Sequence, residues 1–199
     1  MTTIMITAGG TGGHVFPALA VARALRSDNI DVVWLGTREG IEARLVPAAG
    51  FAIDYLRIRS LRGGGLLRWL LLPLRLNVAM LQALAILHRR RPAAVLAMGG
   101  FAAGPGGLMA SLLNIPLIVH EQNAVAGLTN RILGTFVKAA FTAFPEAARN
   151  FPARKVHQLG NPIRRSLMEN FMRPSAEHAR PGLLVFGGSQ GAHALNMRV

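Results

Sequence analysis

The 199-residue chain is strongly basic, with 22 Lys and Arg residues against 9 Asp and Glu and a formal net charge of +13. This balance favours an anionic partner, although a genome rich in arginine codons would account for part of it. The absence of Cys excludes disulfides and thiolate metal sites, and the His, Asp and Glu residues show no metal-ligand spacing. We therefore expect neither a bound metal nor a cofactor.

Short apolar runs alternate with stretches of helical periodicity. The chain opens on a buried strand at residues 3–7, and not on a signal peptide, because no basic segment precedes the apolar run. The remaining pattern predicts helices at 17–26 and 43–49 and strands at 31–35, 52–58, 94–98, 116–119, 139–142 and 155–159. Strands separated by helices predict an α/β fold, a parallel sheet with helices on both faces, whose ligands bind beyond the carboxyl ends of the strands.

A domain boundary is expected at the Gly-Asn-Pro sequence of residues 160–162. A polar stretch follows, and then a strand expected at 183–186 leads into another glycine-rich turn. One strand and the start of a helix cannot bury a core. We therefore expect a domain at 1–162 and only the beginning of a second domain at 163–199, in a truncated chain. The alternative is that this last unit packs on the first domain.

Three glycine-rich turns each follow an expected strand and precede a helix, at residues 9–14 (GGTGGH), 99–107 (GGFAAGPGG) and 187–191 (GGSQG). Glycine lets the backbone approach a ligand closely, and a helix N-terminus favours phosphate. One such turn is explained equally well without a ligand, but three favour phosphate binding. None matches G-x-G-x-x-G or G-x-x-x-x-G-K-[ST], and no acidic residue ends the second strand. The pattern therefore argues against a nicotinamide oxidoreductase, which remains an alternative, and against a P-loop kinase.

The window of residues 55–120 contains eight Arg and no Asp or Glu. Its middle, residues 66–76 (LLRWLLLPLRL), places Arg68 and Arg75 on one helical stripe. Each arginine would cost roughly 2.5–3.5 kcal/mol near a bilayer centre, so a transmembrane span is disfavoured. A segment lying in the headgroup region fits better, with leucines in the acyl boundary and arginines on anionic lipid. The alternative is a pair of core helices with a solvated arginine edge.

Four polar residues, His120, Glu121, Gln122 and Asn123, follow the strand expected at 116–119. Polar residues at that place point to the ligand site of a parallel sheet. Glu121 is expected to stay ionised in a positive field, where it accepts hydrogen bonds from sugar hydroxyls or orients a histidine. The alternative is a helix cap or a buried network.

His14 ends the first glycine turn. A histidine at such a place suits a general base, because its ordinary pKa lies near neutrality. The alternative is a turn histidine that caps the helix or bonds to the backbone.

Five segments together resemble the MurG family, the bacterial peptidoglycan N-acetylglucosaminyltransferases: 9–17 (GGTGGHVFP), 98–107 (MGGFAAGPGG), 120–130 (HEQNAVAGLTN), 160–164 (GNPIR) and 187–192 (GGSQGA). The resemblance implies a GT-B fold of two Rossmann-like domains, the second only begun here. It also implies inverting transfer of N-acetylglucosamine from UDP-N-acetylglucosamine to the C4 hydroxyl of the muramoyl sugar of lipid I, which gives lipid II. The enzyme would act as a peripheral protein on the cytoplasmic face of the inner membrane.

The resemblance also assigns residues by position. His14 matches the suspected base. Donor-binding positions are matched by Thr11, Gly12, Gly13, Asn123, Arg164 and Ser189. The acceptor pyrophosphate is expected at the turns that contain Gly9, Gly10, Gly99, Gly100 and Gly104. The membrane-facing patch is matched by Leu66, Leu67, Arg68, Trp69, Leu70, Leu71, Leu72 and Arg75.

We expect a direct displacement in which His14, helped by Glu121, takes the proton from the acceptor hydroxyl while helix N-termini and Arg164 stabilise the departing UDP. The expected partners are UDP-N-acetylglucosamine, lipid I and anionic inner-membrane lipids. Nucleic acid is not expected, since the basic runs lack interleaved aromatic residues. The 199-residue chain alone is expected to be inactive. The alternative is a membrane-associated, acceptor-binding half of a split glycosyltransferase.

Overall fold

The computed structural model describes residues 2–58, 71–171 and 197. Residues 66–70 of the expected membrane patch, the strand expected at 183–186 and the third glycine turn with Ser189 lie outside the described residues. The chain divides into two compact units, Met1–Arg165 and Ser166–Val199. The first unit contains the features that follow, and the domain boundary expected at residue 162 stays a prediction.

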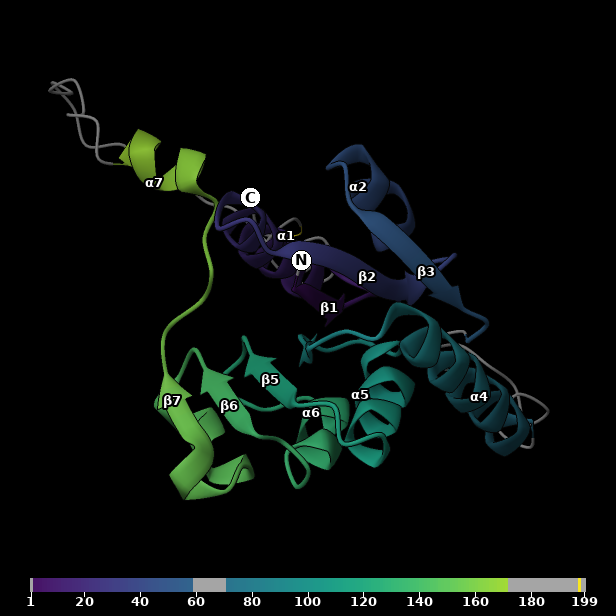
Figure 1. The fold of residues 1–199 in the computed structure, drawn as a ribbon. Coiled ribbons are helices and arrows are strands. Elements are labelled where there is room, and N and C mark those ends of the chain that lie inside the picture. The colour runs from purple at the N-terminus through teal and green to yellow at the C-terminus, as the bar shows by residue number, and fades with distance from the viewer. Residues whose placement is uncertain (1, 59–70, 172–196, 198–199) are drawn as a thin grey trace, which may run out of the picture. The chain divides into compact units, whose positions relative to one another are not determined.

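A single parallel sheet organises the first unit (Figure 1). Its strands, as far as the structure describes the chain, are β1 (Thr3–Thr7), β2 (Asp31–Thr37), β3 (Ala52–Leu56), β4 (Ala94–Ala97), β5 (Leu117–Glu121), β6 (Ala139–Thr142) and β7 (Val156–Gln158). They pair in the order β3-β2-β1-β4-β5-β6-β7. The strand order reverses between β1 and β4, and in open α/β sheets ligands bind at this switch point.

Helices connect the strands as the alternating pattern predicts. They are α1 (Gly12–Ser27), α2 (Glu42–Ala48), α4 (Leu72–Arg90), α5 (Ala103–Leu112) and α6 (Leu128–Leu133), and α7 (Arg165–Phe171) follows the sheet. Two 3-10 helices, η1 (Pro145–Asn150) and η2 (Ala153–Lys155), lie between β6 and β7. The predicted parallel α/β fold with helices on both faces is confirmed.

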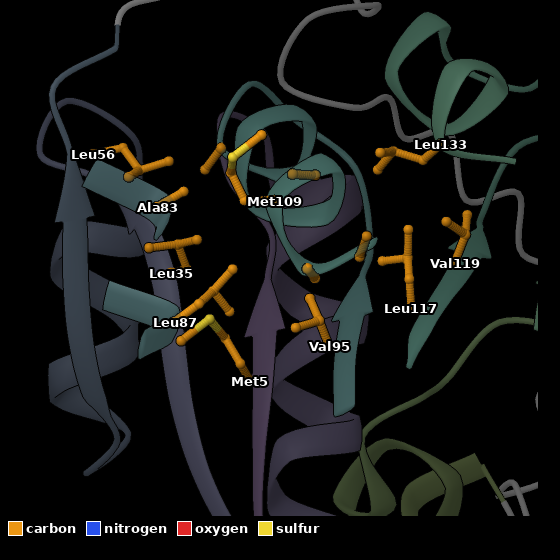
Figure 2. Close-up of a cluster of buried hydrophobic side chains, with 14 of the residues drawn as sticks. Met5, Leu35, Leu56, Ala83, Leu87, Val95, Met109, Leu117, Val119 and Leu133 are labelled. Atoms are coloured by element: carbon orange, nitrogen blue, oxygen red, sulfur yellow. The ribbon is translucent and has the colours of Figure 1, made fainter. Parts of the chain in front are cut away.

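Alternate residues of the central strands enter two separate apolar cores. On one face, Met5 of β1 packs with residues of α4, α5 and α6, and Figure 2 shows this cluster between the sheet and the helices. On the other face, Ile6 packs with residues of α1 and α2. The fully buried Trp34 of β2 lies in this second core and donates its indole N–H to the carbonyl of Ala8 at 2.9 Å. That hydrogen bond fixes the chain just where the first glycine turn begins.

The first helix begins earlier than predicted. We expected a helix from residue 17, but α1 begins at Gly12 and includes two glycines, although glycine is a poor helix former. Pro17 therefore lies inside the helix, where it has no N–H to donate to the carbonyl four residues before it. The consequence is that Gly12, Gly13 and His14 belong to the first turn of a helix and not to a loop.

The fifth strand ends later than predicted. His120 and Glu121 were expected to follow the strand, but they are its last two residues and pair in register with Phe141 and Thr142 of β6. Both side chains are buried, with 4% and 0% of their surfaces exposed. The prediction that four polar residues follow the strand is therefore wrong for His120 and Glu121.

Helix α4 begins at Leu72 with Pro73 in its first turn, a position that proline tolerates well. Its second half packs into the first core through Ala83 and Leu87. Arg89 and Arg90 at its end both donate to the carboxylate of Asp54 in β3, each at 2.7 Å. Part of the positive charge in the acid-free window is thus neutralised by the acid that just precedes it. No described helix is long and apolar enough to span a bilayer.

Candidate functional site

The first and second glycine turns meet at the switch point, with backbone against backbone. The N–H of Gly9 donates to the carbonyl of Gly99 at 3.3 Å. Gly100 has a φ of +88°, and a Cβ atom on it would lie 2.9 Å from the carbonyl carbon of Gly9. Only glycine permits this close approach. The carboxyl ends of β1 and β4 are therefore held together as one structure.

His14 lies on top of this junction. A Cβ atom on Gly99 would be 2.8 Å from Cδ2 and 2.9 Å from Nε2 of His14, so the bare glycine makes room for the imidazole. The ring Nδ1 lies 3.3 Å from the hydroxyl of Thr11, the residue that precedes α1. The half-buried His14 is thus the last residue of the first glycine turn and packs on the second.

Burial lowers the pKa of His14 below its ordinary value of 6.5, an effect that the charge of Glu121 and a backbone hydrogen bond with Gly9 partly offset. A lowered pKa leaves the imidazole neutral at pH 7, with one ring nitrogen free of a proton. A neutral imidazole at this place can accept a proton, and the role of His14 as a base stays a prediction.

Two helix N-termini face the same junction. Helix α1 starts at Gly12 directly after Thr11, and α5 starts at Ala103, so Gly104 lies in its first turn. Neither helix has a side-chain cap within the described residues. The first N–H groups of a helix have no intrahelical acceptor and carry partial positive charge. Both termini therefore suit oxyanions such as phosphate.

Glu121 is surrounded by hydrogen-bond donors. Its carboxylate accepts from the backbone and side-chain N–H groups of Asn123 at 3.0 and 2.9 Å, from the N–H of Gly127 at 3.0 Å and from the side chain of Asn130 at 2.9 Å. A fully buried carboxylate needs such partners. These contacts match the buried-network alternative, and Glu121 affects His14 through its charge.

The segment after β7 is tied back to the ends of β4 and β5. His120 Nε2 lies 3.0 Å from the carbonyl of Gly160, and the side chain of Asn161 donates to the carbonyl of Gln122 at 3.1 Å. Gln122 in turn donates to the carbonyl of Met98 at 3.0 Å. Burial lowers the pKa of His120, partly offset by the Gly160 hydrogen bond. The neutral ring therefore donates from Nε2, which holds the segment in place.

The same segment brings Arg164 to the first turn of α1. The Arg164 guanidinium lies over the Phe16 ring at 5.4 Å. The Phe16 ring also packs on Gly12, where a Cβ atom would lie 3.1 Å from it. A fixed positive charge is thus added beside an uncapped helix N-terminus, and cation–π contact orients it.

The predicted site residues divide into three groups. The first group lies at the carboxyl ends of β1 and β4 and forms the switch-point site: Thr11, Gly12, Gly13, His14, Gly99, Gly100 and Arg164. The exposed Asn123 belongs to the Glu121 network, and Ser189 lies outside the described residues. Phe16, which packs on Gly12, and Glu42, which accepts the N–H of Gly10, were not predicted as site residues, because nothing local distinguishes them from ordinary helix residues.

A sequence model of the glycosyltransferase family 28 N-terminal domain matches residues 4–142. The chain belongs to glycosyltransferase family 28. The matched range includes both glycine turns and His14 of the switch-point site, whereas Arg164 lies beyond it.

Curated relatives share more than half of the aligned residues. A UDP-N-acetylglucosamine–N-acetylmuramyl-(pentapeptide) pyrophosphoryl-undecaprenol N-acetylglucosamine transferase from Anaeromyxobacter sp. (strain Fw109-5) is 59% identical, over 98% of this chain and 52% of the relative. The transferase of the same name from Alkalilimnicola ehrlichii is 53% identical, over 98% of this chain and 55% of the relative. The chain spans about half the length of these family 28 relatives.

A crystal structure of MurG from Acinetobacter baumannii aligns with 100% of this chain and 56% of its own, with a TM-score of 0.78 and 39% identity. The resemblance to the MurG group of family 28 is thereby confirmed at the level of sequence and of fold.

Proposed function

We propose that the chain is the acceptor-binding part of an inverting N-acetylglucosaminyltransferase. The reaction moves N-acetylglucosamine from UDP-N-acetylglucosamine to the C4 hydroxyl of the muramoyl sugar of lipid I and forms lipid II. The observation that carries this proposal is the 59% identity, over 98% of the chain, to a relative named for that donor and acceptor. The switch-point site supports it, because a neutral histidine in the first turn of α1 packs on Gly99 of the turn that leads into α5, and both helix N-termini suit phosphate.

In the proposed mechanism His14 is the general base. The acceptor oxygen attacks the anomeric carbon of the donor, and its proton passes to the unprotonated ring nitrogen of His14. The bond between the anomeric carbon and the UDP oxygen breaks, and UDP leaves with the electron pair from the opposite face, so the configuration inverts. Glu121 acts by its negative charge, which stabilises the imidazolium that forms. Its own oxygens stay with the hydrogen bonds of the buried network.

The two phosphate groups of the acceptor are proposed to bind the N–H groups at the starts of α1 and α5, which follow the first and second glycine turns. The N–H groups of Gly9 and Gly10 themselves are already donated to Gly99 and Glu42. Arg164 adds a positive charge beside α1 for the donor side of the reaction. Asn123 and Ser189 keep their proposed role in donor binding. A domain of the kind that occupies the other half of the relatives would supply the rest of the donor pocket.

The membrane-facing surface is proposed to include the first half of α4. Leu74 and Leu81 of this helix are 63% and 65% exposed, and Arg75 lies between them. Exposed leucines next to arginine suit an interface of acyl chains and anionic headgroups. The protein would then work as a peripheral protein at the cytoplasmic face of the inner membrane, where lipid I presents its pyrophosphate.

Binding to the 199-residue chain tests the proposal. We expect a short-chain, water-soluble lipid I analogue to bind in isothermal titration calorimetry, while UDP-N-acetylglucosamine binds at least tenfold more weakly or not at all. An analogue that lacks the pyrophosphate should lose most of the affinity. Binding of the donor without measurable binding of the acceptor analogue would refute the assignment of this domain to the acceptor.

A further inference from the structure

Glu42, the first residue of α2, is a fully buried carboxylate that the proposed mechanism does not use. Its Oε2 accepts the N–H of Gly10 at 3.1 Å. Its Oε1 accepts the backbone N–H of Thr37 at 2.9 Å and the Thr37 hydroxyl at 2.7 Å. One carboxylate therefore joins the turn after β1 to the end of β2.

Three glycines form the space that holds this side chain. A Cβ atom on Gly9 would lie 2.5 Å from Oε1, and one on Gly36 would lie 2.7 Å from Cγ of Glu42. A Cβ atom on Gly40 would overlap the carboxylate itself. The glutamate thus fills a socket between the two turns, and its tight fit leaves it a single place to lie.

The contacts continue from this socket to the base. Gly10, which Glu42 binds, is adjacent to Gly9, and Gly9 is bonded to Gly99. His14 rests on Gly99. A displacement of the first glycine turn away from Glu42 would therefore move both the imidazole and the N-terminus of α1.

We infer that Glu42 is a positioning residue, which holds the first glycine turn so that the N-terminus of α1 and His14 keep their places for a diphosphate ligand. The part about the ligand rests on the proposed function, whereas the part about His14 does not. Glu42 acts through the Gly10 hydrogen bond and touches neither substrate nor reacting atoms.

The variant Glu42→Gln separates this role from a purely electrostatic one. A carboxamide keeps the shape and one acceptor oxygen for Thr37, but its NH2 group opposes the N–H of Gly10. If Glu42 acted by charge alone, removing the negative charge would tighten pyrophosphate binding and lower the pKa of His14 further. Displacement of the turn would instead weaken pyrophosphate binding, because the anion site becomes disordered. It would also raise the pKa of His14, because water reaches the ring.

Thr37→Val is the matched control. It removes the 2.7 Å hydroxyl contact with the same carboxylate and the acceptor of the Gly40 N–H, and it leaves the Gly10 contact in place. We expect this variant to be less stable to urea without a change in pyrophosphate affinity or in the His14 titration.

The experiment uses the isotope-labelled 199-residue chain with inorganic pyrophosphate as the probe, followed by NMR. Loss of a hydrogen bond to a charged group predicts that Glu42→Gln weakens pyrophosphate binding about tenfold. The pKa of His14 should rise toward 6.5 in this variant. The inference would be overturned if the two variants had equal effects or if Glu42→Gln had none. It would also be overturned if Glu42→Gln tightened pyrophosphate binding and lowered the pKa of His14.

Two further readouts keep the outcomes distinct. If the unmutated chain fails to bind pyrophosphate, the proposed anion site is wrong, and the His14 titration in the two variants then decides the role of Glu42. If Glu42→Gln does not fold, amide exchange in the unmutated chain decides. Gly10 and Gly13 are both exposed. The N–H of Gly10 donates to Glu42, so it should exchange with solvent much more slowly than the N–H of Gly13. Equal exchange rates would contradict the inference.

Discussion

At the scale of single residues, the half-buried His14 and the buried His120 connect the site to pH. Burial is the main cause that lowers the pKa of His14 and of His120. A lowered pKa in the folded state means that the unfolded chain binds more protons below pH 6.5. The stability that this neutrality provides is complete above pH 6.5 and is lost as the pH falls below it.

His120→Gln tests this linkage where it holds the segment after β7. Glutamine can still donate to the carbonyl of Gly160, but it does not titrate. We expect urea unfolding between pH 7 and pH 5 to lose less stability in this variant than in the unmutated chain. The difference is at most about 1.4 kcal/mol per pH unit. An unchanged slope in His120→Gln would contradict the linkage.

The sequence pointed to His14 as a candidate site residue but not to Glu42. His14 ends a glycine turn, so its local setting already indicates a ligand site. The contact between Glu42 and Gly10 joins residues 32 positions apart, and it depends on α2 packing beside β2. Likewise, the buried network around Glu121 was only an alternative in the sequence analysis, because its burial depends on a strand end that the sequence did not define.

At the scale of elements, the boundaries were hardest to predict where tertiary contacts set them. β5 continues through His120 and Glu121 because β6 offers two more pairing partners in register. α1 includes two glycines because the helix must begin at the junction of the two turns. By contrast, the strands at 3–7 and 139–142 have the predicted bounds, since Gly9 closely follows the first strand and Pro145 closely follows the second.

Helix α4 allows a test of the membrane-facing surface. Replacing the exposed Leu74 and Leu81 by serine removes apolar area from that surface without touching the core. We expect binding to phosphatidylglycerol vesicles to fall about tenfold for each leucine that inserts, while the urea midpoint stays unchanged. Leu159→Ser is the matched control, since Leu159 is 67% exposed but follows β7 at the other edge of the sheet. Equal losses in both variants would argue against a surface on α4.

At the scale of the whole molecule, alternating strands and helices predicted a parallel sheet, but not the order of its strands. That order decides the function, because it makes the turns after β1 and β4 neighbours although they are about 90 positions apart in the chain. The five motifs supplied the resemblance that the family match confirms. The site nevertheless needed the fold to bring Arg164 beside α1.

Transfer by a two-domain protein tests the central claim most directly. Residues 1–165 of this chain would be joined to the second half of the Anaeromyxobacter relative and supplied with radiolabelled UDP-N-acetylglucosamine and a lipid I analogue. We predict a labelled lipid II product, and turnover lower by about 10²–10⁴ in His14→Ala with nearly unchanged donor affinity. A folded fusion that binds the donor but never labels lipid I, or one whose turnover is indifferent to His14, would contradict the account.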